Sequence, residues 1–341
     1  MKKNLTVSSK PKRHFLAAFG ALLLVLIVSA CGTNNDTSNQ ASSTPPASQQ
    51  GSEASPSSSA GSGGTFTDAM GHKVAIPANP QRVIASYLED HLVALGVKPA
   101  AQWSVANGIQ DYLQADGLEG VPTIAYDLPP ETVASFTPDL IVIGSESQVQ
   151  NGLYEQYNKI APTYVLGDAV NNDWRQALLK IGELLGKSDE AKRAIADYDA
   201  KIAEAKTKLQ TAVDGKSAAI LWLVQKQFYM VNEIVSSGAV LYGDLGIKQS
   251  GMQLGLPAEA AANWNPITME KLAELDADYL FLVNSDKGQG TDTLDNPIWK
   301  GIPAVKAGHV YEFEKTSSWL YSGAVANGQI VDDLLTALNV K

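Results

Sequence analysis

Cysteine, histidine and arginine are scarce in this chain, which has one, four and four of them among 341 residues. A single cysteine excludes a disulfide framework within the chain. Three of the histidines, His72, His91 and His309, are too widely separated to match the spacing of zinc ligands. The sequence therefore disfavours a zinc or manganese carrier.

Basic charge is also in short supply. The chain has 26 Lys and Arg against 36 Asp and Glu, and five of the basic residues lie in 1–30, which holds no acid. The remainder therefore carries 21 positive against 36 negative charges. Nucleic acid is excluded as an expected partner, because its recognition needs a basic surface.

No apolar run reaches the roughly 20 residues of a membrane-spanning helix. The longest covers 15–30, follows Lys and Arg residues, and ends at Cys31. This order is typical of a lipoprotein signal, so we expect 1–30 to be a cleaved signal peptide and Cys31 to carry the lipid. A transmembrane anchor with an incidental cysteine is the alternative, and the short run counts against it.

The segment after Cys31 has the composition of a tether. Residues 32–64 contain ten Ser and no Leu, Ile, Val or aromatic residue, so they cannot bury enough apolar surface to fold. We expect 31–64 to be a lipidated, disordered linker. The remaining residues suit two lobes, with an N-terminal lobe at 65–187, a linking helix at 188–213 and a C-terminal lobe at 214–341.

Short apolar segments alternate with helical patterns through both expected lobes. Strands are predicted at 82–86, 100–103, 123–126, 140–144, 163–166, 218–224, 228–232, 279–283 and 310–313, and helices at 90–95, 238–245 and 324–338. Such alternation predicts an α/β fold with a parallel sheet covered on both faces, and residues 228–232 are expected to return as part of a hairpin.

One long amphipathic helix is predicted between the lobes. Apolar residues recur at intervals of three and four from 188 to 210, namely Ala191, Ile195, Tyr198, Ile202, Ala205 and Leu209. A helix of this length can connect two lobes as a rigid spacer.

The lobes also share a weak internal repeat. Glu131, two apolar residues and Asp139 precede the strand at 140, and Glu270, two apolar residues and Asp278 precede the strand at 279. The offset between the two motifs is constant along their length. A two-lobed clamp would produce such a repeat.

Several motifs resemble those of ferric-siderophore-binding lipoproteins of ABC importers. They run in order as Pro80-Gln-Arg-Val-Ile84, Leu95-Gly-Val-Lys-Pro99, Pro130-Glu-Thr-Val-Ala-Ser-Phe-Thr-Pro-Asp139, Trp174-Arg175, Ile181-Gly-Glu-Leu-Leu-Gly-Lys187, Asn296-Pro-Ile-Trp299 and Ile302-Pro-Ala-Val-Lys306. The resemblance implies two Rossmann-like lobes joined by one long α-helix, a ligand cleft between them, and no catalysis. It also implies that Glu131 and Glu270 dock to the two permease subunits, and that iron arrives coordinated by the siderophore, so no protein metal ligands and no cofactor are expected. The alternative is a structural role, in which each glutamate stabilises the start of its helix through the helix dipole.

Aromatic residues follow the predicted strands at the edge where open parallel sheets bind ligands. The candidate ligand contacts are Tyr87, Trp103, Tyr126, Gln225, Gln227, Tyr229, Trp264, Trp319 and Tyr321. Any one of these aromatics could instead be a core side chain. As a set they predict an aromatic-lined cleft.

Arginine scarcity helps to choose the ligand. Arg175 is the one arginine expected to face the cleft, with an ion pair on the helix surface as an equal alternative. Family members that bind polyanionic carboxylate siderophores gather several arginines, so the resemblance favours a nearly neutral ferric hydroxamate here. Ferric citrate, a mixed citrate-hydroxamate complex, haem and cobalamin stay open as ligands.

An exported hydrolase is the alternative from another class. Gly215-Lys-Ser217 imitates the end of a phosphate loop but lacks its first glycine, and the chain has no nucleophile elbow. We therefore expect a monomeric, extracellular, lipid-anchored receptor, on a Gram-positive cell, whose partners are a ferric siderophore and an ABC permease.

Overall fold

The computed structural model describes residues 63–106, 108–256, 263–290 and 293–340. By its internal contacts the chain divides into two units, 1–55 and 56–341, and every described residue belongs to the second. The expected signal peptide 1–30, Cys31 and nearly all of the tether lie outside the described residues. Within the described ranges, no helix has both the length and the apolar character needed to cross a membrane.

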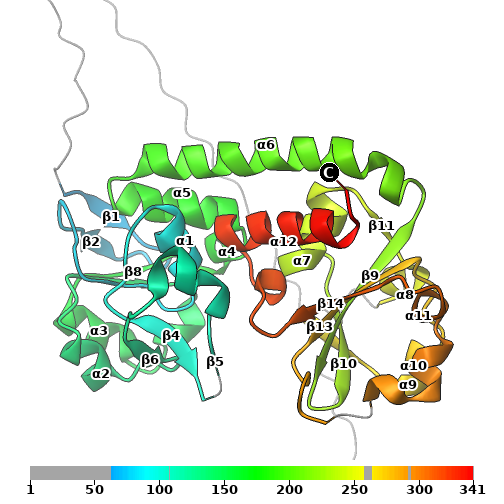
Figure 1. Ribbon diagram of the computed structural model, residues 1–341. Coiled ribbons are helices and arrows are strands. Elements are labelled where there is room, and N and C mark those ends of the chain that lie inside the picture. The colour runs from blue at the N-terminus through cyan, green and yellow to red at the C-terminus, as the bar shows by residue number, and fades with distance from the viewer. Residues whose placement is uncertain (1–62, 107, 257–262, 291–292, 341) are drawn as a thin grey trace, which may run out of the picture. The chain divides into compact units, whose positions relative to one another are not determined.

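We call the elements from β1 to α5 the N-lobe (Figure 1). Its strands are β1 Thr65–Thr67, β2 Lys73–Ala75, β3 Val83–Ile84, β4 Gln102–Val105, β5 Gly108–Ile109, β6 Thr123–Ala125, β7 Leu140–Ile143 and β8 Thr163–Val165. Its helices are α1 Glu89–Ala94, η1 Asp111–Leu113, η2 Gln114–Leu118, α2 Pro130–Ser135, η3 Glu146–Val149, α3 Leu153–Ile160, α4 Asp168–Asn171 and α5 Trp174–Leu184.

The N-lobe sheets are largely parallel, as predicted. β3, β7 and β8 pair in parallel, and β4 pairs with β6 in parallel while β5 runs antiparallel to β4. Leu140 and Val142 of β7 face one apolar cluster, and Ile141 and Ile143 face another. This alternation is the signature of a sheet that is covered on both faces.

We call the elements from β9 to α12 the C-lobe. Its strands are β9 Ser217–Val224, β10 Gln227–Val231, β11 Lys248–Gln249, β12 Trp264–Ile267, β13 Tyr279–Asn284 and β14 Val310–Glu314. Its helices are α7 Ser236–Gly238, η4 Ala239–Asp244, α8 Gly251–Leu254, α9 Met269–Leu272, η5 Thr293–Asp295, α10 Pro297–Gly301, α11 Pro303–Lys306, η6 Ser318–Leu320 and α12 Ala324–Ala337.

The C-lobe sheet is mixed, and the hairpin predicted around 228–232 is confirmed. β9, β13 and β14 are parallel, but β10 runs antiparallel to both β9 and β12. β9 and β10 form a hairpin whose turn residues, Gln225 and Lys226, have φ values of 49° and 63°. Asp286 supports this left-handed turn by accepting hydrogen bonds from both backbone amides, at 2.8 and 2.7 Å. A side chain distant in sequence thus stabilises a turn without glycine.

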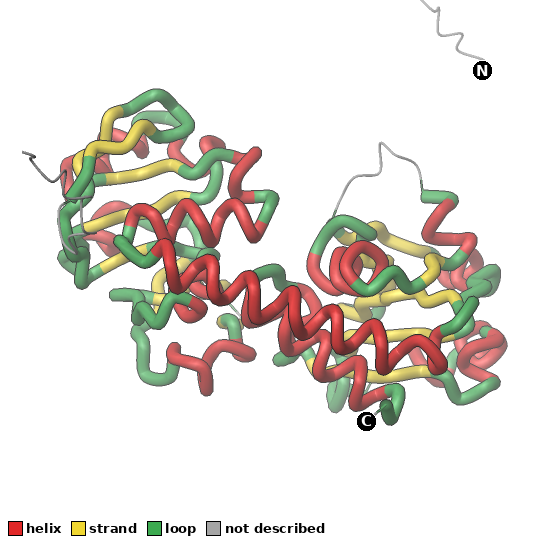
Figure 2. Tube along the Cα trace, turned by 90° about the horizontal axis from the view of Figure 1, so that it is seen from above, coloured by secondary structure: helices red, strands yellow, loops and turns green. Residues whose placement is uncertain are grey.

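α6 (Ser188–Val213) is the predicted connecting helix, and its 26 residues span about 39 Å. Ala191 packs into an N-lobe cluster, whereas Tyr198, Ile202, Ala205 and Leu209 belong to a C-lobe cluster. Figure 2 shows α6 passing the strands of both lobes with α12 beside its second half. One helix therefore contributes to two cores, which confirms its predicted apolar face.

The repeated segments occupy equivalent places in the two lobes. Asp139 accepts hydrogen bonds from the backbone amides of Gln81 and Arg82, just before β3. Asp278 accepts one from the amide of Ser217 at the start of β9. Each aspartate therefore joins the start of its own strand to the start of the parallel neighbour.

Candidate ligand-binding cleft

A cavity of about 500 Å³ is lined by aromatic side chains from both lobes. Its lining consists of Tyr87, Trp103, Val105, Tyr126, Gln148, Trp222, Trp264, Leu320 and Tyr321. A second, more polar cavity of about 920 Å³ adjoins it and shares Val105, Trp222, Leu320 and Tyr321 with it. The two cavities form one cleft with an aromatic part and a polar part.

The N-lobe wall of the cleft follows the ends of parallel strands. Tyr87 comes after β3 in a left-handed conformation (φ 63°), and its ring lies 5.0 Å from that of Trp103 and 6.2 Å from that of Tyr321. Tyr126 follows β6 and is 62% exposed. The predicted location of these aromatics in the cleft is confirmed. Their contact with a ligand stays a prediction.

The C-lobe wall centres on Trp222, which the sequence interpretation missed. Its ring lies 5.5 Å from both Tyr229 and Trp264, and its Nε1 donates a hydrogen bond to Ser285 Oγ at 2.9 Å. Trp264 lines the aromatic cavity as predicted, whereas Tyr229 only supports Trp222 from outside the lining. The continuous apolar run of β9 gave no signal for it, because Trp222 and Val224 are half-buried within a strand whose other residues are buried.

The polar part of the cleft contains the hairpin turn. Gln225 lines it as predicted, beside Asp286, which holds the turn. Asp111 of the N-lobe and Lys315 of the C-lobe are the other charged residues in its lining. Among the described residues, neither lining includes an arginine, and Lys315 is the one basic side chain.

A buried carboxyl group lies behind the aromatic wall. Glu89 is fully buried, and its Oε1 accepts a hydrogen bond from the backbone amide of Trp103 at 2.6 Å. Burial raises the pKa of Glu89 to about 8, and burial followed by the nearby Glu89 raises the pKa of Tyr87. Both groups are therefore neutral near pH 7, which leaves the aromatic cavity without charge at this wall.

Trp319 is not a ligand contact, which corrects the sequence prediction. It is fully buried, stacks on Phe313 at 4.0 Å, and donates from Nε1 to Asp333 Oδ2 at 2.9 Å. The short 3₁₀ turn η6 rotates successive side chains by about a third of a circle. Trp319 therefore enters the core while Leu320 and Tyr321 reach the cleft.

Arg175 does not line either cavity. Its Nη2 lies 2.9 Å from Asp199 Oδ1 and 3.6 Å from Asp244 Oδ1, and its guanidinium lies over the Trp174 ring at 4.4 Å. The expectation of a cleft-facing arginine is corrected in favour of the ion pair. The physical reason is that α5 directs this side chain toward α6 and η4, where two carboxylates meet it.

Glu131 and Glu270 are exposed and lie in the first turns of α2 and α9. Among the described residues, no ion pair engages either carboxylate. Both are accessible for a partner, and the docking role stays a prediction.

Two of the three histidines of the folded part have neighbours that account for them: His72 stacks on Tyr154 and contacts Asp68, and His309 lies against the carbonyl of Asp278. His91 is buried, its Nδ1 has no hydrogen-bond partner among the described residues, and burial lowers its pKa to about 4. Across the described ranges, no group of three or more His, Cys, Asp or Glu side chains is arranged to hold a metal ion.

Two α/β lobes, one connecting helix and an aromatic cleft define a substrate-binding protein of the two-lobed type. The chain belongs to the periplasmic binding protein family, whose profile matches residues 86–316. Members of this family are binding proteins and not enzymes.

Relatives cover nearly the whole chain. A probable siderophore-binding lipoprotein of Bacillus subtilis, YfiY, is 28% identical over 95% of this chain and 98% of its own length. The iron(3+)-hydroxamate-binding protein FhuD of the same species is 28% identical over 92% of this chain and 94% of its own.

Solved structures share the fold. A FhuD fold-family periplasmic binding protein from Bacillus subtilis has a TM-score of 0.68 at 24% identity and covers 80% of this chain and 99% of its own. SirA of Staphylococcus aureus, complexed with staphyloferrin B, has a TM-score of 0.66 at 24% identity and covers 82% of this chain and 99% of its own. The two-lobed fold predicted from the sequence is confirmed.

Proposed function

We propose that this protein captures a ferric siderophore of the hydroxamate type and delivers it to an ABC permease. The aromatic cleft lined by both lobes is the observation that carries the proposal. The printed functions of the relatives, siderophore and iron(3+)-hydroxamate binding, support it. Iron arrives already chelated as part of the ligand, so the protein needs no metal ligands of its own.

The charge of the cleft favours a nearly neutral complex. Asp111 and Asp286 are countered in its lining by Lys315 alone. A polyanionic carboxylate complex would lose its hydration shell without gaining the bidentate arginine contacts that compensate for it. A ferric tris-hydroxamate instead places an apolar, weakly charged shell against the aromatic rings. Ferric citrate, haem and cobalamin are the competing ligands.

Quenching of tryptophan fluorescence tests the ligand class. Ferric hydroxamates should quench strongly, and ferric citrate, ferric catecholates, haem and cobalamin weakly, because Trp103, Trp222 and Trp264 line the aromatic cavity. Trp222→Phe should remove part of the quenching. Trp299→Phe is the matched control, since Trp299 is buried against Phe228 outside the cleft. A response confined to citrate or catecholates would reject the hydroxamate assignment, and turnover of a hydrolase substrate panel would reject the binding class.

Glu131 and Glu270 are proposed to dock to the two permease subunits. Their equivalent places in the repeated motif suit a pseudo-two-fold partner, which can make paired contacts with both lobes. Replacing both by Ala should abolish uptake and leave ligand affinity unchanged. The control pair Glu155→Ala and Glu314→Ala removes exposed acids outside the motif. Loss of affinity in the first pair would contradict the docking role.

Cys31 is proposed to anchor the protein to the outer face of a Gram-positive cell membrane. The proposed arrangement is a signal peptide at 1–30, a tether at 31–64, lobes at 65–187 and 214–341, and a connecting helix at 188–213, acting as a monomer. Cys31→Ala should yield a protein in the medium that binds its ligand but supports little uptake. Retention of the variant on membranes would contradict the lipid anchor.

A further inference from the structure

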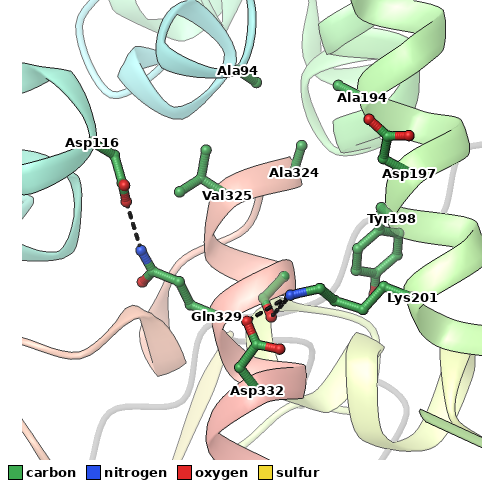
Figure 3. Close-up of a pocket in the computed structure, with 11 residues that line it drawn as sticks. Ala94, Asp116, Ala194, Asp197, Tyr198, Lys201, Ala324, Val325, Gln329 and Asp332 are labelled. Carbon is green, nitrogen blue, oxygen red and sulfur yellow. Dashed lines mark hydrogen bonds and ion pairs between the residues drawn. The ribbon is translucent and has the colours of Figure 1, made fainter. Parts of the chain in front are cut away.

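α12 contacts the N-lobe as well as its own lobe. Ala326 belongs to a buried cluster with Tyr112, Leu113 and Leu118, and Val325 packs against it. Further along the helix, Gln329 Nε2 donates to the carbonyl of Tyr112 at 3.2 Å and to Asp116 Oδ2 at 2.9 Å. Figure 3 shows this bond to Asp116, with the other face of α12 tied to α6 through Lys201 and Asp332. α12 is therefore a second, non-covalent link between the lobes.

The start of α12 is capped by a carboxylate from the other lobe. Its N-cap residue is Gly323, which has no side chain to accept a hydrogen bond. Asp90 of α1 accepts instead, with Oδ1 from the amide of Val325 at 3.1 Å and Oδ2 from the amide of Ala326 at 2.8 Å. Asp90 is only 2% exposed. The carboxylate thus satisfies two of the amides that a helix start leaves free, and it complements the helix dipole.

Gly323 and Asp90 fit each other closely. A Cβ atom on Gly323 would lie 2.1 Å from Asp90 Oδ1, which no real contact allows. Gly323 also has a φ of 149°, a conformation that other residues rarely adopt. The absence of a side chain at the N-cap is therefore what admits the carboxylate of the opposite lobe.

This cap lies directly behind the cleft. Tyr321, two residues before Gly323, lines both cavities and lies 4.8 Å from the ring of Tyr112. The hydroxyl of Tyr112 donates to Asp90 Oδ2 at 3.1 Å. Asp90 itself lines neither cavity. It contacts the start of α12 and Tyr112, which flank Tyr321.

We propose that Asp90 is a positioning residue for ligand binding: by capping α12 across the lobes, it fixes Tyr321 in the cleft and couples the binding site to the inter-lobe contact. Formation of the site then depends on an inter-lobe bond as well as on the lobes themselves. The proposal rests on the proposed function only through the choice of ferrichrome, a neutral ferric tris-hydroxamate, as a probe.

The first test needs no ligand. The protein is labelled with 3-fluorotyrosine, and the Tyr321 resonance is assigned by its loss in Tyr321→Phe. In Asp90→Asn an amide N–H₂ replaces one of the two acceptors, so the Tyr321 resonance should shift and broaden. Asp116→Ala, which removes the neighbouring inter-lobe bond to Gln329, is the control and should change that resonance far less. An unchanged Tyr321 resonance in Asp90→Asn overturns the proposal.

The second test separates positioning from simple stability. Asp90→Asn should weaken ferrichrome binding about ten-fold, but in a Tyr321→Ala background it should weaken binding less than about two-fold. Equal losses in both backgrounds would overturn the proposal. If Asp90→Asn does not fold, Tyr112→Phe, which removes only the hydroxyl bonded to Asp90, should give the same pattern with a loss of about three-fold. If ferrichrome does not bind the unaltered protein, the hydroxamate assignment fails, and the fluorine resonance decides the positioning role.

Discussion

The two lobes share an aspartate that bonds to the start of a neighbouring strand, but they line the cleft with different side chains. Asp139 in the N-lobe and Asp278 in the C-lobe each accept hydrogen bonds from the backbone at the start of a neighbouring parallel strand. Beyond that shared contact the lobes diverge. The N-lobe keeps its sheets largely parallel, whereas the C-lobe inserts the antiparallel strand β10 through a tight hairpin.

Their interiors differ as well. In the C-lobe, Phe281, Phe313 and Trp319 stack on one another, whereas the N-lobe cluster on the α5 side of β7 is mainly aliphatic. The N-lobe in turn buries two adjacent carboxyl groups, Glu89 and Asp90, beside the cleft. A shared framework thus places strands, and lobe-specific side chains determine the chemistry of each wall.

The largest expected effect comes from breaking the aromatic C-lobe core. Trp319→Ala should lower the free energy of unfolding by about 3–5 kcal/mol, because it leaves a cavity beneath Phe313 and Phe281. Ligand affinity of the folded fraction should fall little, since Trp319 is fully buried. Urea unfolding and ligand titration would measure the two quantities. Trp103→Ala, on the cleft wall, should show the reverse pattern, and a matching loss of affinity in both variants would contradict the distinction.

Removing the shared aspartates tests how far the lobes are equivalent. Asp139→Ala and Asp278→Ala should each lower the free energy of unfolding by about 1–3 kcal/mol, because each leaves strand-end amides without an acceptor. The double variant should be additive within about 0.5 kcal/mol, since the two sites share no partners. Chemical unfolding of the two single variants and the double variant would measure these free energies. A negligible change in the free energy of unfolding for one variant would mean that the two aspartates do not contribute equally to stability, despite their equivalent places in the sequence repeat.

The lobes should also respond oppositely to pH. Burial raises the folded-state pKa of Glu89 from 4.5 to about 8, so its contribution to stability is fully present below pH 4.5 and is lost as pH rises through 8. The hydrogen bond from the Ser217 amide lowers the pKa of Asp278, so its contribution is lost only as pH falls through that lowered value. Between pH 7 and 9, stability should fall by about 1 kcal/mol through Glu89.

Glu89→Gln isolates this effect, because its amide oxygen can still accept from Trp103 while the side chain no longer ionises. Urea unfolding at pH 7, 8 and 9 should give a flatter profile for the variant than for the unaltered protein. Parallel profiles would show that Glu89 is not the group that titrates.

The smallest expected effect concerns the ion pair that joins the lobes behind the cleft. Arg175 of α5 contacts Asp199 of α6 and Asp244 of the C-lobe, but all three are partly exposed to solvent. Arg175→Met should lower the free energy of unfolding by less than about 1 kcal/mol and leave ligand affinity unchanged. Calorimetric titration would check the affinity. A substantial loss of ligand affinity would instead support a cleft-facing role for Arg175, which the sequence left open.

Most of the fold could be predicted because periodicity is a local property of the sequence. The apolar face of α6 and the strands β7, β8 and β13 follow directly from residue spacing. β10 was anticipated as part of a hairpin, but its effect on the direction of the sheet was not, since Asp286 stabilises the turn from 60 residues away.

The site was predictable in part for the same reason. Tyr87 and Tyr126 follow strand ends, where sheet geometry alone places a ligand. Trp222 was missed because it lies within a strand, and Trp319 was misassigned because a 3₁₀ turn separates it from Tyr321. Side-chain direction in such short turns depends on packing that no local pattern encodes.

Composition and regular spacing are enough to specify the two-lobed α/β architecture, the long connecting helix, the repeated aspartates and the aromatic character of the cleft. Long-range contacts in the folded protein set which aromatics face the cleft and where Arg175 points, and they bring Asp90 of one lobe to the start of α12 in the other. Residues 90 and 325 interact across 235 positions of chain, and such contacts arise only when the folded lobes meet.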